Sequence, residues 1–261
     1  MKNAGDEQIV EFYRRLLPSL LSRDLKVKYQ RSLLGFVWTL INPILVSLIL
    51  ITVFTVVVRI PIESYWAFLL SGYFAWNFTQ QCIGASSSIF QEHASLRRNV
   101  AFPIEILVLS AALSRVVEFL VELVVVVALL CYLHHGNVPP SIALLPVIIL
   151  IQVFIVLGIM FPISVLSVMF HDVQHAIPTI TLILFYISPI LYPVNYVPDA
   201  ALPWYYINPL VIPLELFHQS IYEGRFPSLT LIITALGISA FFCSIGYLIF
   251  SVFKNECIET A

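Results

Sequence analysis

Apolar residues gather along the chain in six long stretches, separated by shorter polar or proline-rich segments. A helix of about 20 apolar residues crosses a hydrocarbon core roughly 30 Å thick, and within lipid only a closed hydrogen-bonded backbone is tolerated. We therefore predict an all-α integral membrane protein with six transmembrane helices. The predicted spans are 34–58, 65–90, 104–133, 142–170, 176–193 and 228–253.

Two further segments depart from the pattern of long spans. In residues 9–21, apolar side chains recur at helical spacing while Glu11 and Arg15 fall on the opposite side, which is typical of a helix lying in the membrane interface. In residues 194–227, prolines alternate with aromatic residues, and the apolar stretch 209–222 is too short to span. We predict one or two short re-entrant helices there, at the outer face.

The composition agrees with a membrane setting. Of the 261 residues, 60% are hydrophobic and only 11% are charged, and the mean hydropathy is +0.95. An ordinary soluble domain has about 25% charged residues. We predict a single transmembrane domain made of an interface helix with a basic segment (1–33), spans one to five (34–193), an outer segment (194–227) and the last span with its tail (228–261).

The positions of the basic residues indicate the topology. Of the 13 Lys and Arg residues, ten lie in segments assigned to the cytoplasm, seven of them before the first span, and only Arg59 and Arg225 lie in segments assigned to the outside. Cytoplasmic loops carry an excess of Lys and Arg. Both termini are therefore predicted to be cytoplasmic, although the inner loop around Asp172 has no basic residue.

The sequence shows no motif for nucleotide binding or bond chemistry. The patterns GxxxxGK[ST], GxGxxG, GxSxG and HExxH are absent, so energy must come from a partner or a gradient. The four cysteines form no CxxC pair and are interpreted as reduced structural thiols. His134, His135, His171 and His175 are interpreted as loop residues, so no metal, cofactor or nucleic-acid partner is predicted for this chain.

Arg115, Glu118 and Glu122 form a charged cluster inside the third predicted span. Their spacing puts them on one face of a helix, and an isolated charge inside a membrane costs at least about 2.5–3.5 kcal/mol. The cluster is thus predicted to face protein rather than lipid. It either forms ion pairs that pack helices together or lies along a polar transport route.

Two other patterns leave their roles open. The polar stretch 91–103 is either an ordinary turn or a docking surface for a cytoplasmic ATPase. Aromatic residues gather near the predicted span ends, where they either form the interfacial belt or line a route for sugars, whose C–H faces stack on aromatic rings. The aromatic candidates are Tyr73, Trp76, Tyr192, Trp204, Tyr205 and Tyr206.

Residues 23–43 carry the most distinctive motif, RDLKVKYQRSLLGFVWTLINP. This motif resembles the opening of the ABC-2 type permeases that export O-antigen polysaccharide, capsule and teichoic acid. The resemblance continues with RRN at 97–99, SPILYP at 188–193 and NPL at 208–210, and it covers essentially the whole chain. The family's order of interface helix, two spans, coupling helix, three spans, outer gate helices and last span is the order predicted above.

The resemblance implies a homodimer bound to two separate ATPase subunits, which hold ATP and Mg, with a channel between the protomers for polysaccharide carried on undecaprenyl-pyrophosphate. It also implies a bacterial inner-membrane location, no catalysis by this chain, and a periplasmic gate formed by 198–222. The coupling helix near 92–101 would contact the ATPase through His93, Ser95, Leu96, Arg97, Arg98 and Asn99. Basic charge suits a lipid pyrophosphate at the cytoplasmic entrance, and the residues placed there are Arg23, Lys26, Lys28 and Arg31.

Three other functions compete with this interpretation. A related permease would export teichoic acid, capsule or a small hydrophobic drug. A membrane-embedded transferase acting on lipid-linked sugars would use acid-base groups, and its candidates are Glu118, Glu122, His134, His135 and Asp172. A carrier driven by an ion gradient would use the charges of the third span.

Overall fold

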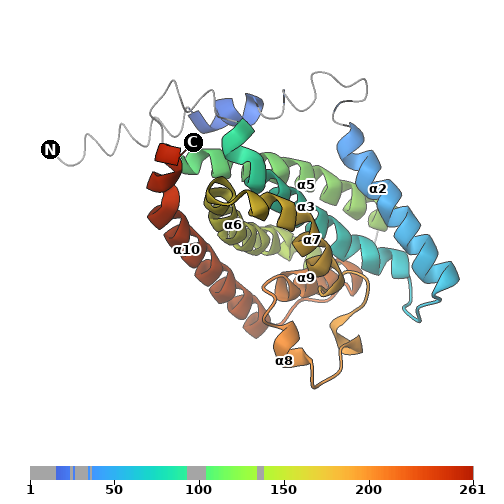
Figure 1. Cartoon of the computed structure of the whole chain (residues 1–261). Coiled ribbons are helices and arrows are strands. Elements are labelled where there is room, and N and C mark those ends of the chain that lie inside the picture. Colours follow the sequence, from blue (N-terminus) through green and yellow to red (C-terminus); the bar gives the residue numbers. More distant parts are fainter. Residues whose placement is uncertain are drawn as a thin grey trace.

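The structure is a computed structural model in which every regular element of the described part is a helix, which confirms the all-helical fold class (Figure 1). The residues described are 16–23, 26, 35, 37–92, 104–133 and 138–260. At 132–133, 255 and 258–260 only the backbone is described.

Helices occupy all six stretches that the hydropathy pattern marks out. They are α2 (Val37–Thr52, continued by the π-helical turn η1, Val53–Val57), α3 (Tyr65–Glu92), α5 (Glu105–Leu133), α6 (Leu145–Met169, preceded by the 3-10 turn η2, Pro140–Leu144), α7 (His171–Tyr186) and α10 (Leu229–Thr260). The predicted short helices in the outer segment are also present, as η3 (Val194–Tyr196), α8 (Leu202–Tyr205), α9 (Val211–Phe217) and η4 (His218–Tyr222).

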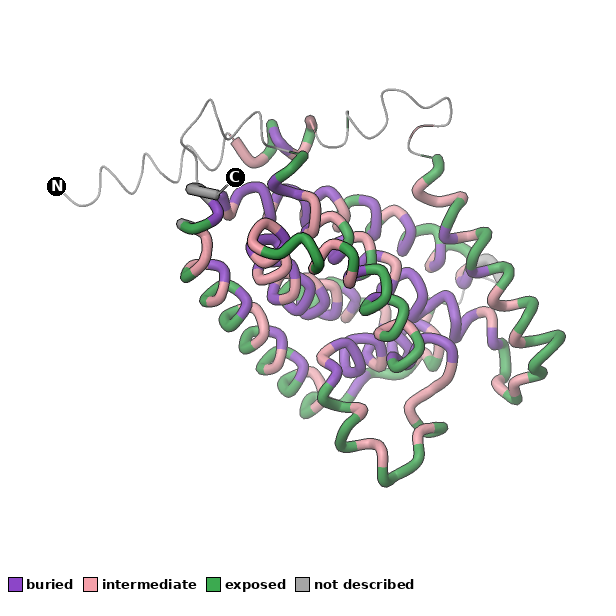
Figure 2. The backbone as a smooth tube through the Cα atoms, in the orientation of Figure 1, coloured by how far each residue is buried: buried purple, intermediate pink, exposed green. Residues whose placement is uncertain are grey.

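Three described segments are long and apolar enough to cross a membrane, namely Val37–Val57, Pro140–Met169 and Leu229–Lys254. In the most apolar 18-residue stretch of Val37–Val57, only 11% of the residues are buried, and in that of Leu229–Lys254 only 17% are. Helices α2 and α10 therefore turn apolar side chains outward. Figure 2 shows the contrast, because buried residues concentrate on the helices between α2 and α10. Lipid is the solvent that accepts such outward-facing apolar helices, and the chain is accordingly a membrane protein.

The fifth predicted span, 176–193, is wrong in its boundaries. Helix α7 begins at His171, directly after Phe170, whose extended conformation ends α6, and it ends at Tyr186. The first turn of α7 contains Asp172, and a carboxylate is favourable at a helix N-terminus. Polar residues that hydropathy places in a loop therefore start this helix, while residues 188–191 form a buried turn after it.

Helix α6 packs along α10 more extensively than any other pair of described elements. Two glycines make this close crossing feasible. A Cβ atom on Gly246 would lie 2.7 Å from the Gly158 carbonyl carbon, and a Cβ atom on Gly158 would lie 2.6 Å from the Phe242 carbonyl carbon. Small residues let membrane helices approach to backbone contact, so these glycines set the distance between α6 and α10.

The end of the helical bundle that the sequence assigns to the cytoplasm is tied by two contacts from α10. The Lys254 Nζ atom lies 2.5 Å from Glu105 Oε1 at the start of α5. The Cys257 thiol lies 3.6 Å from the Val165 carbonyl oxygen on α6. Helix α10 thus contacts the first residue of α5, two positions after the 93–103 segment, which itself lies outside the described residues.

Candidate functional site

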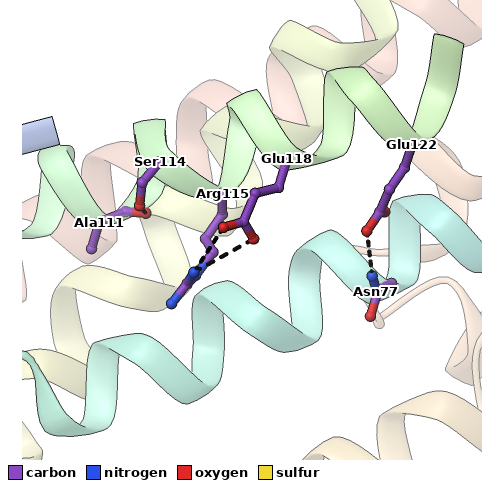
Figure 3. Close-up of polar contacts among 6 residues, drawn as sticks. All are labelled: Asn77, Ala111, Ser114, Arg115, Glu118 and Glu122. Atoms are coloured by element: carbon purple, nitrogen blue, oxygen red, sulfur yellow. Dashed lines mark hydrogen bonds and ion pairs between the residues drawn. The ribbon is translucent and has the colours of Figure 1, made fainter. Parts of the chain in front are cut away.

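The charged cluster predicted in the third span lies on α5 and faces α3 (Figure 3). Arg115 Nη1 lies 3.3 Å from Glu118 Oε1, and the Glu122 carboxylate accepts a 2.9 Å hydrogen bond from Asn77 Nδ2 on α3. Both glutamates are 1% exposed. Each buried carboxylate therefore has a polar partner, which is the arrangement that a buried charge requires.

A groove opens between α2, α3 and α7. It consists of a cavity of about 510 Å³ between α2 and α3 and a second cavity of about 360 Å³ that extends to α7, and the two share Val46, Tyr73 and Gln80. We call it the α2–α3 groove. Its lining residues are Gly35, Trp38, Thr39, Asn42, Pro43, Val46, Tyr73, Trp76, Asn77, Gln80, Gln81, Pro178, Thr181, Leu182 and Phe185.

The charged cluster adjoins the groove, because Asn77 lines the groove and also binds Glu122. None of the described residues that line the groove is charged. Its polar groups are amides and hydroxyls, which can both donate and accept hydrogen bonds. The groove therefore suits a ligand with hydroxyl groups and apolar faces.

The aromatic candidates fall into two places. Tyr73 and Trp76 line the α2–α3 groove, and Trp76 Nε1 donates a 3.1 Å hydrogen bond to Gln80 Oε1 one turn away. The other four lie after α7, Tyr192 just before the outer segment and the rest within it; the rings of Tyr192 and Tyr205 are 6.5 Å apart and Trp204 is 76% exposed. The structure brings no member of this second group into the groove lining.

A buried histidine that sequence reasoning missed holds the outer segment against the helices. His218 Nε2 donates to the Pro189 carbonyl oxygen at 2.7 Å, so in the neutral ring Nδ1 accepts from the Ser71 hydroxyl, also at 2.7 Å. The imidazole stacks on Phe68 at 4.2 Å, and a Cβ atom on Gly72 would lie 2.7 Å from its Cε1 atom. We call this arrangement the His218 latch.

Burial sets the protonation of groups in the outer segment. Desolvation lowers the pKa of His218 from 6.5 to about 4, which outweighs the raising effect of the Pro189 hydrogen bond. Desolvation raises the pKa of Glu215, whose carboxylate accepts hydrogen bonds from Tyr206 at 3.4 Å and Gln219 at 3.1 Å. At neutral pH the latch histidine is therefore uncharged.

The groove amides were also missed from sequence. The available signal is polar side chains in otherwise apolar predicted spans, as with Asn42 in the first and Asn77, Gln80 and Gln81 in the second. Which of them share a cavity depends on how α2 packs on α3. The histidine signal is weaker, because His218 is one of several polar residues in the stretch 209–222, together with Glu215, Gln219 and Ser220.

Several predicted site residues lie outside the described part of the chain. They are His93, Ser95, Leu96, Arg97, Arg98 and Asn99 of the predicted coupling helix near 92–101 and Lys28 and Arg31 of the predicted cytoplasmic entrance. Of the remaining entrance residues, Lys26 is exposed and Arg23 is half-buried. The Arg23 Nη1 atom is buried and has no hydrogen-bond partner in the described part.

Among the residues considered for a transferase, the three that the structure describes do not form an assembled acid-base site. Glu118 and Glu122 are buried on α5, and Asp172 is exposed in the first turn of α7. His134 and His135 lie outside the described part. Among described residues, no group of three or more His, Cys, Asp or Glu is arranged to hold a metal ion.

Fold and groove together define a helical membrane protein with a cleft between apolar helices, and the described residues that line this cleft include amides and hydroxyls but no charged side chain. Comparison with known proteins identifies the family of this membrane protein. The sequence pattern of the ABC-2 type transporter family matches residues 15–222. The O-antigen export system permease protein RfbA of Myxococcus xanthus is 31% identical over 218 residues, which cover 82% of this chain and 83% of that protein.

A protein of the same name from Klebsiella pneumoniae is 30% identical over 187 residues, covering 70% of this chain and 71% of that protein. A second Klebsiella pneumoniae protein of this name is 29% identical over 187 residues. The chain therefore belongs to the ABC-2 type transporter family, and the resemblance in residues 23–43, 97–99 and 188–210 is confirmed at the level of the family.

Proposed function

We propose that this chain is the membrane-spanning permease of an ABC exporter that moves undecaprenyl-pyrophosphate-linked polysaccharide, most directly O-antigen, across the bacterial inner membrane. The names of its relatives support the cargo class. The observation that carries the proposal from the structure is the α2–α3 groove, whose exposed Trp38 ring and whose amides match the C–H faces and hydroxyls of sugars. Family and groove thus point to the same kind of cargo.

Six spans with both termini in the cytoplasm accommodate this function. Besides the three segments of spanning length and hydropathy, α3, α5 and α7 would cross the membrane around them. Their polar residues are partly hidden inside the bundle, as Glu118 and Glu122 are. The outer segment, with α8 and α9, would then close the periplasmic end.

Energy would come from two copies of a separate ATPase, which bind ATP and Mg, because the sequence has no phosphate-binding loop. Residues 93–99 would dock the ATPase, and a homodimer of this chain would enclose the route. The Glu105–Lys254 ion pair links the start of α5, six residues after Asn99, to α10. Movement at the coupling stretch would reach α5 and α10 through this link.

The basic residues Arg23, Lys26, Lys28 and Arg31 would receive the lipid pyrophosphate at the cytoplasmic entrance. Phosphate groups bind guanidinium and ammonium groups by charge-assisted hydrogen bonds. The buried Arg23 Nη1 atom without a partner in the described part supports this placement. Neutralising these residues should weaken export while assembly stays intact.

The test is affinity purification of the chain co-expressed with the ATPase encoded beside it, followed by an ATPase assay of the complex. The matched variant carries Arg97→Ala and Arg98→Ala. We expect a stable complex whose assembly or ATPase activity drops in the variant. An isolated chain that acts chemically on lipid-linked sugars without any ATPase would refute the proposal.

A further inference from the structure

The α2–α3 groove carries four side-chain amides on helices proposed to span the membrane, namely those of Asn42, Asn77, Gln80 and Gln81. An amide that faces hydrocarbon loses its hydrogen bonds at a large cost in free energy. Asn42 and Gln80 are nevertheless exposed on the groove side of their helices. These amides therefore need a polar neighbour inside the membrane, either water with a polar cargo or a second protein surface.

Two of the amides are held so that they complement hydroxyl groups. Gln80 uses its carbonyl oxygen to accept from Trp76 Nε1, so its amide nitrogen keeps two hydrogens to donate. Asn77 uses its amide nitrogen to donate to Glu122, so its carbonyl oxygen keeps its capacity to accept. A sugar hydroxyl both donates and accepts, and the groove offers it one group of each kind within one helical turn.

The apolar part of the lining fits the same ligand. Trp38 on α2 is 43% exposed, whereas Tyr73 and Trp76, across the groove on α3, are buried at 7% and 2% exposure. The Trp38 ring therefore offers a flat apolar surface with few directional demands, which suits a polymer that has to slide. A hexose unit would present a C–H face to this ring and hydroxyls to the amides.

Charge decides between classes of polymer. No described lining residue is cationic, and the nearby Glu122 carboxylate is hydrogen-bonded to Asn77 behind the groove wall. A carboxylate or phosphate on the polymer would enter this space with no counter-charge from the described lining residues and with the Glu122 carboxylate nearby. Juxtaposed like charges are an established way of rejecting the wrong partner.

We propose that the α2–α3 groove selects neutral, hydroxyl-rich glycans over polymers whose repeating units carry carboxylate or phosphate groups. The proposal rests on the function proposed above and narrows its cargo. The pyrophosphate of the carrier lipid is not part of this selection, because it would be received at the basic entrance.

The test uses the chain with its ATPase in proteoliposomes and two matched probes. One is an undecaprenyl-pyrophosphate-linked neutral polyhexose, and the other is the same polymer after oxidation of part of its primary alcohols to carboxylates. We expect the neutral polymer to be translocated faster by about tenfold or more, since a lone charge inside a membrane is disfavoured by at least that factor. Equal rates would overturn the inference alone, and a complex that moves neither polymer would refute the proposed function as well.

Two variants test whether the groove itself causes the preference for the neutral polymer. Asn42→Lys puts a cation into the groove, and we expect it to raise transport of the oxidised polymer. The ratio of the neutral to the oxidised transport rate should then fall several-fold. Asn195→Lys, in the turn η3 outside the groove lining, makes the same change of side chain and should keep the wild-type ratio. A narrowed ratio in both variants would show that overall charge, not the groove, sets the selection.

The rival explanation is that the amides bind a second copy of this chain rather than glycan. Asn42→Ala and Gln80→Ala test it, because interhelical amide hydrogen bonds stabilise helix association in membranes. We expect both variants to elute with wild-type mass in size-exclusion chromatography with light scattering. Dissociation of the assembly would assign the amides to the protomer contact and overturn the proposal.

Discussion

Replacing Gly246 by alanine tests whether backbone contact holds α6 against α10. The new Cβ atom would lie 2.7 Å from the Gly158 carbonyl carbon and closer still to its oxygen, whereas ordinary contacts are 3.4–4 Å. The two helices must therefore separate by about 1 Å. A gap of that size loses a quarter to a half of the dispersion energy of the atoms facing it, and overpacking of this kind costs about 1–3 kcal/mol.

The matched control lies on the same helix. A Cβ atom on Gly237 would meet nothing within 4 Å, so Gly237→Ala adds the same methyl group without displacing α10. Because both changes raise helix propensity by a similar amount, their difference isolates the packing cost. We expect Gly246→Ala to unfold on the order of 5 °C below Gly237→Ala.

The assay is thermal unfolding of the purified protein in detergent, followed with a fluorophore that reacts with thiols. Cys82 and Cys257 are fully buried, so they react only when the helices separate. An unfolding temperature for Gly246→Ala equal to or above that of Gly237→Ala would refute the reasoning. It would mean that α10 is held to α6 by something other than the close glycine crossing.

Three more predictions follow from the contacts. The lowered pKa of His218 means that its contribution to stability is complete above pH 6.5 and is lost as the pH falls toward 4, because the unfolded chain takes up a proton that the folded chain does not. We expect unfolding titrations to show a loss of about 2 kcal/mol from pH 7 to pH 5 that is absent in His218→Gln. Arg115→Leu removes the ion pair of the buried Glu118 and should lower the free energy of unfolding by about 3 kcal/mol. Adding Glu118→Leu should recover part of this loss, which a double-mutant cycle would measure. Lys254→Ala should cost no more than about 1 kcal/mol because its pair with Glu105 is partly exposed, and a larger loss in the same unfolding assay would contradict this.

Much of the fold could be predicted from hydropathy because lipid demands long apolar helices. The predicted span 65–90 matches α3, and 104–133 matches α5 almost to the residue. Hydropathy misplaces the start of a helix that begins with polar residues, as α7 does at His171 and Asp172. The favourable interaction of a carboxylate with a helix N-terminus does not appear in a hydropathy profile.

The candidate site was less predictable, because its partners are far apart in sequence. His218 binds Ser71, 147 residues away, and Asn77 binds Glu122, 45 residues away. Sequence singles out the charges of the third span, since charge is conspicuous among apolar residues. It does not show that Asn77 connects Glu122 to a groove, because that depends on the packing of α2, α3 and α5.

The central claim is that this chain provides the membrane route of an ATP-driven polysaccharide exporter. The most direct measurement is ATP-dependent transfer of undecaprenyl-pyrophosphate-linked polysaccharide across proteoliposomes that contain the chain and its ATPase. We predict that transfer requires both proteins and ATP, and that it stops when ATP is replaced by a non-hydrolysable analogue. Transfer driven by an ion gradient without the ATPase, or none with both proteins and ATP present, would contradict the account.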